Sequence, residues 1–134
     1  MKKLVAFVFL SAYSLSSFAC TTFFLNKDGQ LLFGRNYDWV TESGMVMVNA
    51  RGMVKYGAKP NAANFNWVSN YGSVTFNQYG KEFPTGGMNE KGLVVELMWL
   101  DETEYPVRDK RHSLGVLQWI QYQLDCSQSV SEVI

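Results

Sequence analysis

The chain has 134 residues, of which 47% are hydrophobic, 18% charged and 15% aromatic. This composition excludes a disordered or a collagen-like chain. Twelve basic and twelve acidic side chains give a formal net charge of zero, so the sequence lacks the basic footprint of a nucleic-acid-binding protein. Two cysteines are too few for a disulfide scaffold or a structural zinc site, and the single histidine excludes mechanisms that need two.

Residues 1–19 have the pattern of a cleavable export signal. Lysines at residues 2–3 supply the positive charge, residues 4–10 form an unbroken apolar run, and residues 17–19 place small side chains where signal peptidase requires them. We therefore expect a signal peptide that is removed from the mature protein.

The alternative interpretation of this segment is an N-terminal membrane anchor. Serines from Ser11 onward interrupt the apolar stretch well short of the roughly 20 residues that a membrane span needs. We expect cleavage after Ala19 and no stable membrane span. The mature chain, residues 20–134, is then periplasmic or secreted, and it begins with Cys20.

Short runs of strand-forming residues follow Cys20 and are separated by turns rich in glycine and asparagine. Strands are expected at residues 21–25, 30–36, 45–49, 67–77 and 93–100, with turns at residues 26–29 and 89–92. The first two strands should form a hairpin, because residues 26–29 carry hairpin turn chemistry. Chemistry-bearing side chains should therefore lie at strand ends and in loops.

The pattern changes from strands to helices after Pro106. Apolar side chains recur at helical spacing over residues 114–124, with Ser113 as the expected N-cap. Ser129 and Glu132 have the spacing of a capping box, which predicts the start of a second helix. Isolated helices below about 12 residues are marginal, so one turn cannot support itself. We therefore interpret the sequence as the N-terminal portion of a longer protein.

Cys20 is the first candidate catalytic residue. At a processed N-terminus it carries a thiol nucleophile and an α-amino group, whose pKa of ~7.7–8.0 lets it act as a base near neutral pH. The matching reaction is amide hydrolysis through a thioester. Two alternatives remain open: acylation of Cys20 in a lipoprotein, and a disulfide with Cys126 in an oxidising compartment.

Arg35 and Asp38 are the next candidates, because a returning hairpin strand would bring them beside Cys20. An arginine favours a thiolate, and a carboxylate can hold the α-amino group. The alternative is an ordinary surface ion pair of little energetic weight.

Met98 and Trp99 lie at the end of the last expected strand. Their side chains could line an apolar acyl pocket, and a backbone N–H there could bind an oxyanion. The alternative is core packing. His112 lies in a charged run typical of a solvated loop, so we assign it no catalytic role.

Four segments share their order with one family: Cys-Thr-Thr at 20–22, Gly-Arg-Asn-Tyr-Asp-Trp at 34–39, Trp-Val-Ser-Asn-Tyr-Gly-Ser-Val at 67–74 and Gly-Met-Asn-Glu-Lys-Gly-Leu at 87–93. Together they resemble the choloylglycine hydrolase and penicillin V acylase family, which belongs to the N-terminal nucleophile hydrolases. The resemblance covers residues 20–134. It implies an α+β fold, namely the N-terminal part of an αββα sandwich with two antiparallel sheets between helical layers.

The resemblance also implies roles for individual residues. Cys20 corresponds to the nucleophile, Arg35 to the arginine beside it, and Asp38 to the aspartate that contacts the cysteine amine. Trp99 resembles the Gram-negative branch of the family, and its backbone N–H would be one oxyanion donor. An apolar or aromatic acyl group suits Phe24, Met98 and Trp99 as pocket residues.

The family's further oxyanion asparagine and second arginine would lie beyond Ile134, so the 134-residue chain by itself is expected to be inactive. The implied substrate is a small-molecule amide of the penicillin V, N-acyl-homoserine lactone or conjugated bile salt type. No metal or cofactor is implied, and relatives often form homotetramers. The rival hypothesis is a short exported β-rich binding module or lipoprotein without catalysis.

Overall fold

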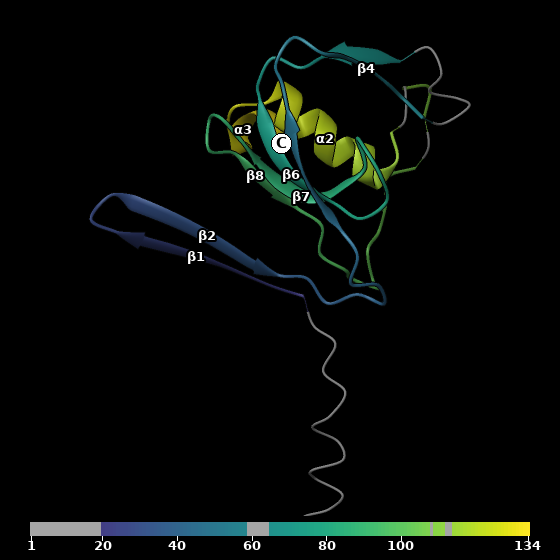
Figure 1. The fold of residues 1–134 in the computed structure, drawn as a ribbon. Coiled ribbons are helices and arrows are strands. Elements are labelled where there is room, and N and C mark those ends of the chain that lie inside the picture. Colours follow the sequence, from purple (N-terminus) through teal and green to yellow (C-terminus); the bar gives the residue numbers. More distant parts are fainter. Residues whose placement is uncertain (1–19, 59–64, 108, 112–113) are drawn as a thin grey trace, which may run out of the picture. The chain divides into compact units, whose positions relative to one another are not determined.

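The computed structural model describes residues 20–58, 65–107, 109–111 and 114–134. The expected signal peptide, the expected N-cap Ser113 and His112 lie outside these residues. The described elements are β1 (Thr21–Lys27), β2 (Gln30–Asn36), β3 (Met45–Asn49), β4 (Val54–Tyr56), β5 (Asn66–Val68), β6 (Ser73–Asn77), β7 (Pro84–Asn89), β8 (Val94–Glu96), α2 (Val116–Cys126) and α3 (Val130–Val133). Antiparallel strands with short helices confirm the α+β class (Figure 1).

The chain divides into two compact units, one ending at Glu42 and the other running from Ser43 to Ile134. The first unit is the hairpin of β1 and β2, paired from Thr21 opposite Asn36 to Lys27 opposite Gln30. Its two-residue turn has positive φ at Asp28 (53°) and Gly29 (80°), as a type I′ hairpin turn requires. The predicted hairpin is therefore confirmed, with a shorter turn and a longer first strand.

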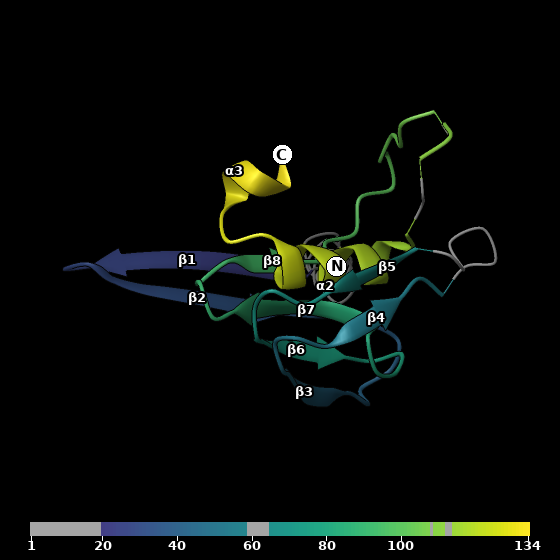
Figure 2. The same ribbon diagram turned by 90° about the horizontal axis from the view of Figure 1, so that it is seen from above.

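The second unit is built on a four-stranded antiparallel sheet of order β3-β6-β7-β8. Helix α2 packs against β7 and β8 on one face of this sheet (Figure 2). The apolar core between them includes Leu93, Ile120 and Leu124, all of which are buried. The periodicity of residues 114–124 thus predicted the burial of Ile120 and Leu124 correctly. It was wrong for Val116 and Trp119, which were expected on the same face and are exposed. The other buried residues of the helix are polar, namely Gln118, Gln121, Gln123 and Asp125. Within the described residues, no helix is long and apolar enough to cross a membrane.

Two of the predicted strands were wrong in extent. Residues 67–77 form β5 and β6 with a break between them, because the backbone N–H groups of Asn70 and Tyr71 donate to the carbonyl oxygen of Asp125 in α2 at 2.8 and 3.1 Å. Those N–H groups are therefore not available to a strand partner. The strand expected at 93–100 stops at Glu96.

Strands β4 and β7 were not predicted. The composition of β7 is that of a turn, with Pro84 followed by Gly86 and Gly87. Close packing explains Gly87, since a Cβ there would lie 2.5 Å from the carbonyl oxygen of Val74 on β6. A glycine in a strand interior can thus mark a close approach of two backbones.

The helix ends also differ from the sequence prediction. Helix α2 begins at Val116 with Gly115 as its N-cap. Ser129 does occupy the N-cap position of α3, but its hydroxyl does not cap the helix. The carboxylate of Glu132 instead accepts hydrogen bonds from the backbone and side chain of Gln128, at 2.9 and 2.7 Å. The capping box was thus predicted at the right residues, but the hydrogen bonds that define a capping box are not formed.

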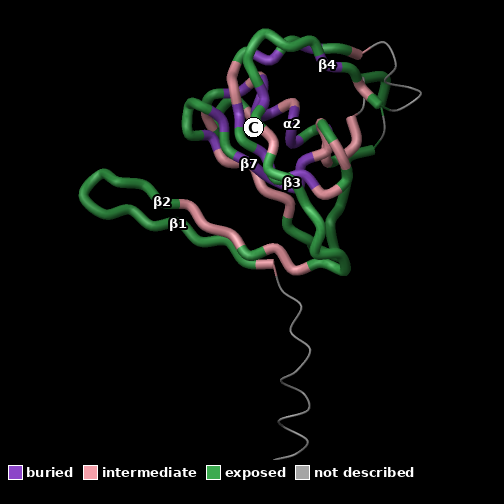
Figure 3. The backbone as a smooth tube through the Cα atoms, viewed as in Figure 1, coloured by how far each residue is buried: buried purple, intermediate pink, exposed green. Residues whose placement is uncertain are grey.

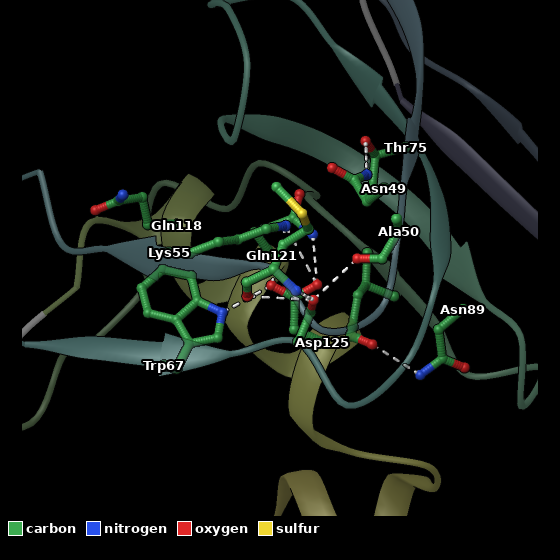
Figure 4. A network of polar contacts seen from close by, with 12 residues as sticks. Asn49, Ala50, Lys55, Trp67, Thr75, Asn89, Gln118, Gln121 and Asp125 are labelled. Atoms are coloured by element: carbon green, nitrogen blue, oxygen red, sulfur yellow. Dashed lines mark hydrogen bonds and ion pairs between the residues drawn. The ribbon is translucent and has the colours of Figure 1, made fainter.

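A polar network joins the β4–β5 hairpin to α2 (Figure 4). The fully buried carboxylate of Asp125 accepts hydrogen bonds from Trp67 Nε1 at 2.7 Å and Gln121 Nε2 at 3.0 Å. Lys55 Nζ pairs with the same carboxylate at 3.1 Å. A two-stranded hairpin is marginal by itself in water, so these contacts help to hold β4 and β5 on the helix. Gln118 of α2 adds hydrogen bonds to the backbone of Tyr56 and Ala58, at 3.0 and 2.8 Å.

The two faces of the four-stranded sheet have opposite characters. Ser73, Thr75 and Asn77 of β6 point to the α2 side and are buried, whereas Val74 and Phe76 point to the other side and are exposed. Register places further exposed apolar side chains beside them, namely Val46, Val48 and Met88. Figure 3 shows the buried residues gathered along β7 and α2.

Candidate functional site

Cys20 lies immediately before β1, and its half-buried thiol contacts the segment that follows β2. The Sγ atom donates a hydrogen bond to the backbone carbonyl oxygen of Asp38 at 3.6 Å. Hairpin pairing creates this contact, because Thr21 lies opposite Asn36 and the chain then continues past Cys20. The structure therefore brings Cys20 and Asp38 together, through the main chain of Asp38.

The carboxylate of Asp38 has a different partner. Its Oδ2 atom accepts a hydrogen bond from Asn36 Nδ2 at 3.1 Å. The side chain of Asn36 thus fixes the direction of the carboxylate next to Cys20. Asn36 was missed as a site residue, although its spacing of two residues from Asp38 is typical of local amide–carboxylate bonds.

Arg35 lies in β2 opposite Thr22, one residue from the strand end. Its guanidinium lies over the ring of Tyr37, with 4.6 Å between Cζ and the ring centroid. The Tyr37 ring in turn lies 6.3 Å from that of Trp39. Alternate residues of an extended chain share one side, so this spacing in the sequence could have indicated the stack. This cation–π contact holds the guanidinium on the strand that pairs with the residues following Cys20.

Phe24 is 61% exposed on β1, opposite Phe33. It shares a strand face with Cys20 but lies four residues, or about 13 Å, along the strand. The hairpin itself therefore does not bring Phe24 into contact with the thiol. Its pocket role stays a prediction.

Met98 and Trp99 follow β8 in the second unit. Trp99 is 70% exposed and Met98 is 44% exposed, so neither side chain packs in the core of the described residues. The indole N–H of Trp99 donates to Asp101 Oδ1 at 2.5 Å. An exposed indole with a fixed polar edge can present its apolar face to a ligand.

A protein-family model described as "Linear amide C-N hydrolases, choloylglycine hydrolase family" matches residues 20–134. The chain belongs to this family. The match begins at Cys20, the residue whose thiol contacts Asp38.

A penicillin V acylase of Pectobacterium atrosepticum is 31% identical to the chain over 141 residues. The alignment covers 97% of the chain and 37% of that relative, so the chain spans little more than a third of the relative's length. No solved structure matches the chain at a significant level.

The two cysteines of the chain have different surroundings. Cys20 and Cys126 both carry free thiols, so the disulfide alternative is not formed in the structure. Desolvation, followed by the charge of Asp125, raises the pKa of Cys126 from 9.0 to about 11. The Cys126 thiol is therefore protonated near neutral pH and is a poor nucleophile.

The family motif at residues 87–93 has a structural role in this chain. The buried side chain of Asn89 donates to the carbonyl oxygens of Leu124 and Ser127, at 3.0 and 2.7 Å. Its Oδ1 atom accepts from the backbone N–H groups of Lys91 and Leu93, at 3.0 and 3.1 Å. Asn89 thus caps the C-terminal end of α2 and shapes the turn after β7.

Acidic, cysteine and histidine side chains are the common protein ligands of metal ions. Within the described ranges, no group of three or more of them is placed to hold a metal ion.

Proposed function

We propose that the chain is the N-terminal portion of an exported hydrolase that cleaves a linear amide C–N bond with Cys20 as its nucleophile. The observation that carries the proposal is the start of the family match at Cys20, whose thiol lies against Asp38 at the end of a hairpin that also holds Arg35. Export to the periplasm or beyond, and a homotetramer of the full-length form, belong to the same proposal.

Removal of residues 1–19 would expose the α-amino group of Cys20. This amine takes the thiol proton, and the thiolate attacks the carbonyl carbon of the substrate amide. A C–S bond forms, the C–N bond breaks, and the proton passes to the leaving amine. Water then attacks the thioester, releases the acid and returns a proton to sulfur.

Three groups of the chain would support these steps. The Arg35 guanidinium favours the thiolate by charge. The Asp38 carboxylate, oriented by Asn36, holds the α-amino group. The backbone N–H of Trp99 donates to the oxyanion, and losing one such donor typically costs about 10²–10³ in rate. Since other donors are expected outside this sequence, the 134-residue chain by itself should be inactive.

The proposed substrates carry an apolar or aromatic acyl group. Phe24, Met98 and Trp99 are all exposed and offer apolar surface for it. The named activity of the Pectobacterium relative makes penicillin V the first substrate to test. N-acyl-homoserine lactones and conjugated bile salts are the other members of the proposed class.

The test compares Cys20→Ala with Cys126→Ala in the full-length protein. We expect Cys20→Ala to abolish release of phenoxyacetate from penicillin V. The matched variant Cys126→Ala removes a thiol whose raised pKa makes it unreactive, so turnover should persist. Hydrolysis that survives in Cys20→Ala, with the same substrate and signal processing intact, would refute the proposal.

A further inference from the structure

Asn36 is the last residue of β2 and joins the end of that strand to the segment that contacts the proposed nucleophile. Its backbone lies opposite Thr21, the residue that follows Cys20. Its Nδ2 atom donates a hydrogen bond to Asp38 Oδ2 at 3.1 Å. All of these residues belong to the first compact unit. Strand pairing thus fixes the backbone of Asn36, and its side chain holds the carboxylate of the residue that contacts Cys20.

Asp38 contacts Cys20 through its main chain, and this contact depends on the thiol proton. Sγ donates to the backbone carbonyl oxygen of Asp38 at 3.6 Å. A carbonyl oxygen only accepts hydrogen bonds, so the contact exists with the protonated thiol and is lost when the thiolate forms. In the proposed reaction the proton moves from sulfur to the α-amino group, which becomes an ammonium group. The carboxylate of Asp38 then holds Cys20 through a charge-assisted hydrogen bond from that ammonium group.

The carboxylate of Asp38 needs support for this task. Asp38 lies beyond the end of β2, and its side chain is only half-buried. Neither strand pairing nor complete burial therefore fixes its side-chain torsions. The bond from Asn36 fixes them at one oxygen. A carboxylate can accept about four hydrogen bonds, so the bond from Asn36 leaves room for the ammonium group.

We infer that Asn36 is a positioning residue of the reaction, because it aims the Asp38 carboxylate at the ammonium group that forms when Cys20 gives up its thiol proton. The inference rests on the proposed function. Asn36 acts through Asp38 and not on the substrate. The pair of ammonium and thiolate exists only after proton transfer, so the bond stabilises the transition state more than the substrate complex. Its loss should therefore lower kcat and leave KM near its value.

The experiment uses the full-length enzyme, processed at Cys20, with penicillin V as substrate. Asn36→Ala removes the donor and should lower kcat about tenfold, as expected for the loss of one hydrogen bond to a charged group, with KM changed less than about twofold. Asn36→Asp keeps the shape of the side chain but replaces the donor by a second negative charge. It should lower kcat at least as much, which a purely steric role of Asn36 would not produce.

Asn26→Ala and Asn26→Asp are the matched controls. Asn26 is an exposed asparagine of the same hairpin, farther along β1 and about 20 Å from Cys20. Both control variants should keep the kcat and the KM of the wild type.

A double-mutant cycle tests whether Asn36 acts through Asp38. Asn36→Ala should lower kcat about tenfold in the wild-type background and about twofold or less when Asp38→Ala is already present, because residues that act together are not additive. A loss of hairpin stability would instead lower the amount of active enzyme by the same factor in both backgrounds.

The rate at which iodoacetamide alkylates Cys20 near pH 7.5 gives the same cycle without a substrate. An ammonium group held near sulfur favours the reactive thiolate. Asn36→Ala should therefore slow alkylation of Cys20 several-fold in the wild-type background and have little effect beside Asp38→Ala. Peptide mapping assigns the label to Cys20, and this readout completes the cycle where the turnover of Asp38→Ala is too slow to measure.

The inference is overturned if Asn36→Ala keeps the kcat of the Asn26 controls, if it raises KM alone, or if its effect persists undiminished beside Asp38→Ala. If the wild type hydrolyses no amide of the proposed class, or if Cys20→Ala retains turnover, the proposed function is itself wrong and the inference falls with it. The two failures are distinguishable, because the first requires turnover that depends on Cys20.

Discussion

Lys55 and Asp125 form an ion pair in the interior of the second unit, with 3.1 Å between Nζ and Oδ2 and with exposed fractions of 3% and 0%. The pair joins β4 to α2 across a large separation in the sequence. Burying two charges is costly, and such pairs persist where other hydrogen bonds complete them. Trp67 and Gln121 supply those bonds, so the pair specifies how the hairpin sits on the helix.

Removing one partner of this pair should be strongly destabilising. Asp125→Asn would leave the Lys55 ammonium buried without its counter-charge, which typically costs about 3–5 kcal/mol. The free energy of unfolding from chemical denaturation measures the effect. The control is Arg51→Ala, which breaks the Arg51–Glu90 pair at 2.5 Å, in which Arg51 is 71% exposed. An exposed pair contributes about 0–1 kcal/mol, so equal losses in the two variants would contradict this account.

Asn89 should be a second position where a small change has a large effect. Asn89→Ala removes two bonds to the end of α2 and two to the turn after β7. Leaving such buried groups unsatisfied costs about 1–3 kcal/mol each before relaxation, so we expect a loss of at least about 2 kcal/mol. Asn26→Ala, an exposed position in β1, is the comparison and should cost much less. Similar stabilities of the two variants would show that the cap is not important.

The Cys126 thiol makes stability depend on pH in the alkaline range. Burial and Asp125 raise its pKa from 9.0 to about 11, so the folded protein holds this proton more tightly than the unfolded chain does. The resulting stability is fully present below about pH 9 and is lost as the pH rises through about 11. Denaturation midpoints between pH 8 and pH 11 should fall in the wild type and fall less in Cys126→Ser. Parallel pH profiles would show that this thiol is not the cause.

Local patterns in the sequence were enough for part of the fold. Asp28 and Gly29 determine a two-residue turn, and with it the register that places Asn36 opposite Thr21. The break between β5 and β6 could not be read locally, because it depends on Asn70 and Tyr71 donating to Asp125 far along the chain. Strand β7 could not be predicted for a similar reason. A Cβ on Gly87 would clash with the backbone of the neighbouring strand β6, so this glycine is explained by a contact that the local sequence does not show.

The candidate site was likewise predictable from the sequence only in part. Hairpin pairing predicts that Arg35 and Asp38 return toward Cys20. In the structure the Cys20 thiol contacts Asp38, and Arg35 lies opposite Thr22. The sequence did not predict that Asp38 would meet the thiol through its carbonyl oxygen while Asn36 holds its carboxylate. Side-chain choices of this kind depend on atomic geometry at the strand end. The catalytic roles of these residues remain predictions for the Cys20 variants to test.

Processing at Cys20 decides between the hydrolase and its rival, because the two hypotheses need different chemical states of that residue. The hydrolase needs a free thiol and a free α-amino group, whereas a lipoprotein needs both blocked. We expect the product purified from the native cell envelope to begin at Cys20, to carry no lipid, and to gain one carbamidomethyl group at Cys20 with iodoacetamide near pH 7.5. Cys126 should resist alkylation at that pH, because its pKa is raised to about 11. Intact mass and peptide mapping measure both outcomes. An added diacylglycerol mass, or a Cys20 that does not react while Cys126 does, would contradict the hydrolase and support the lipoprotein.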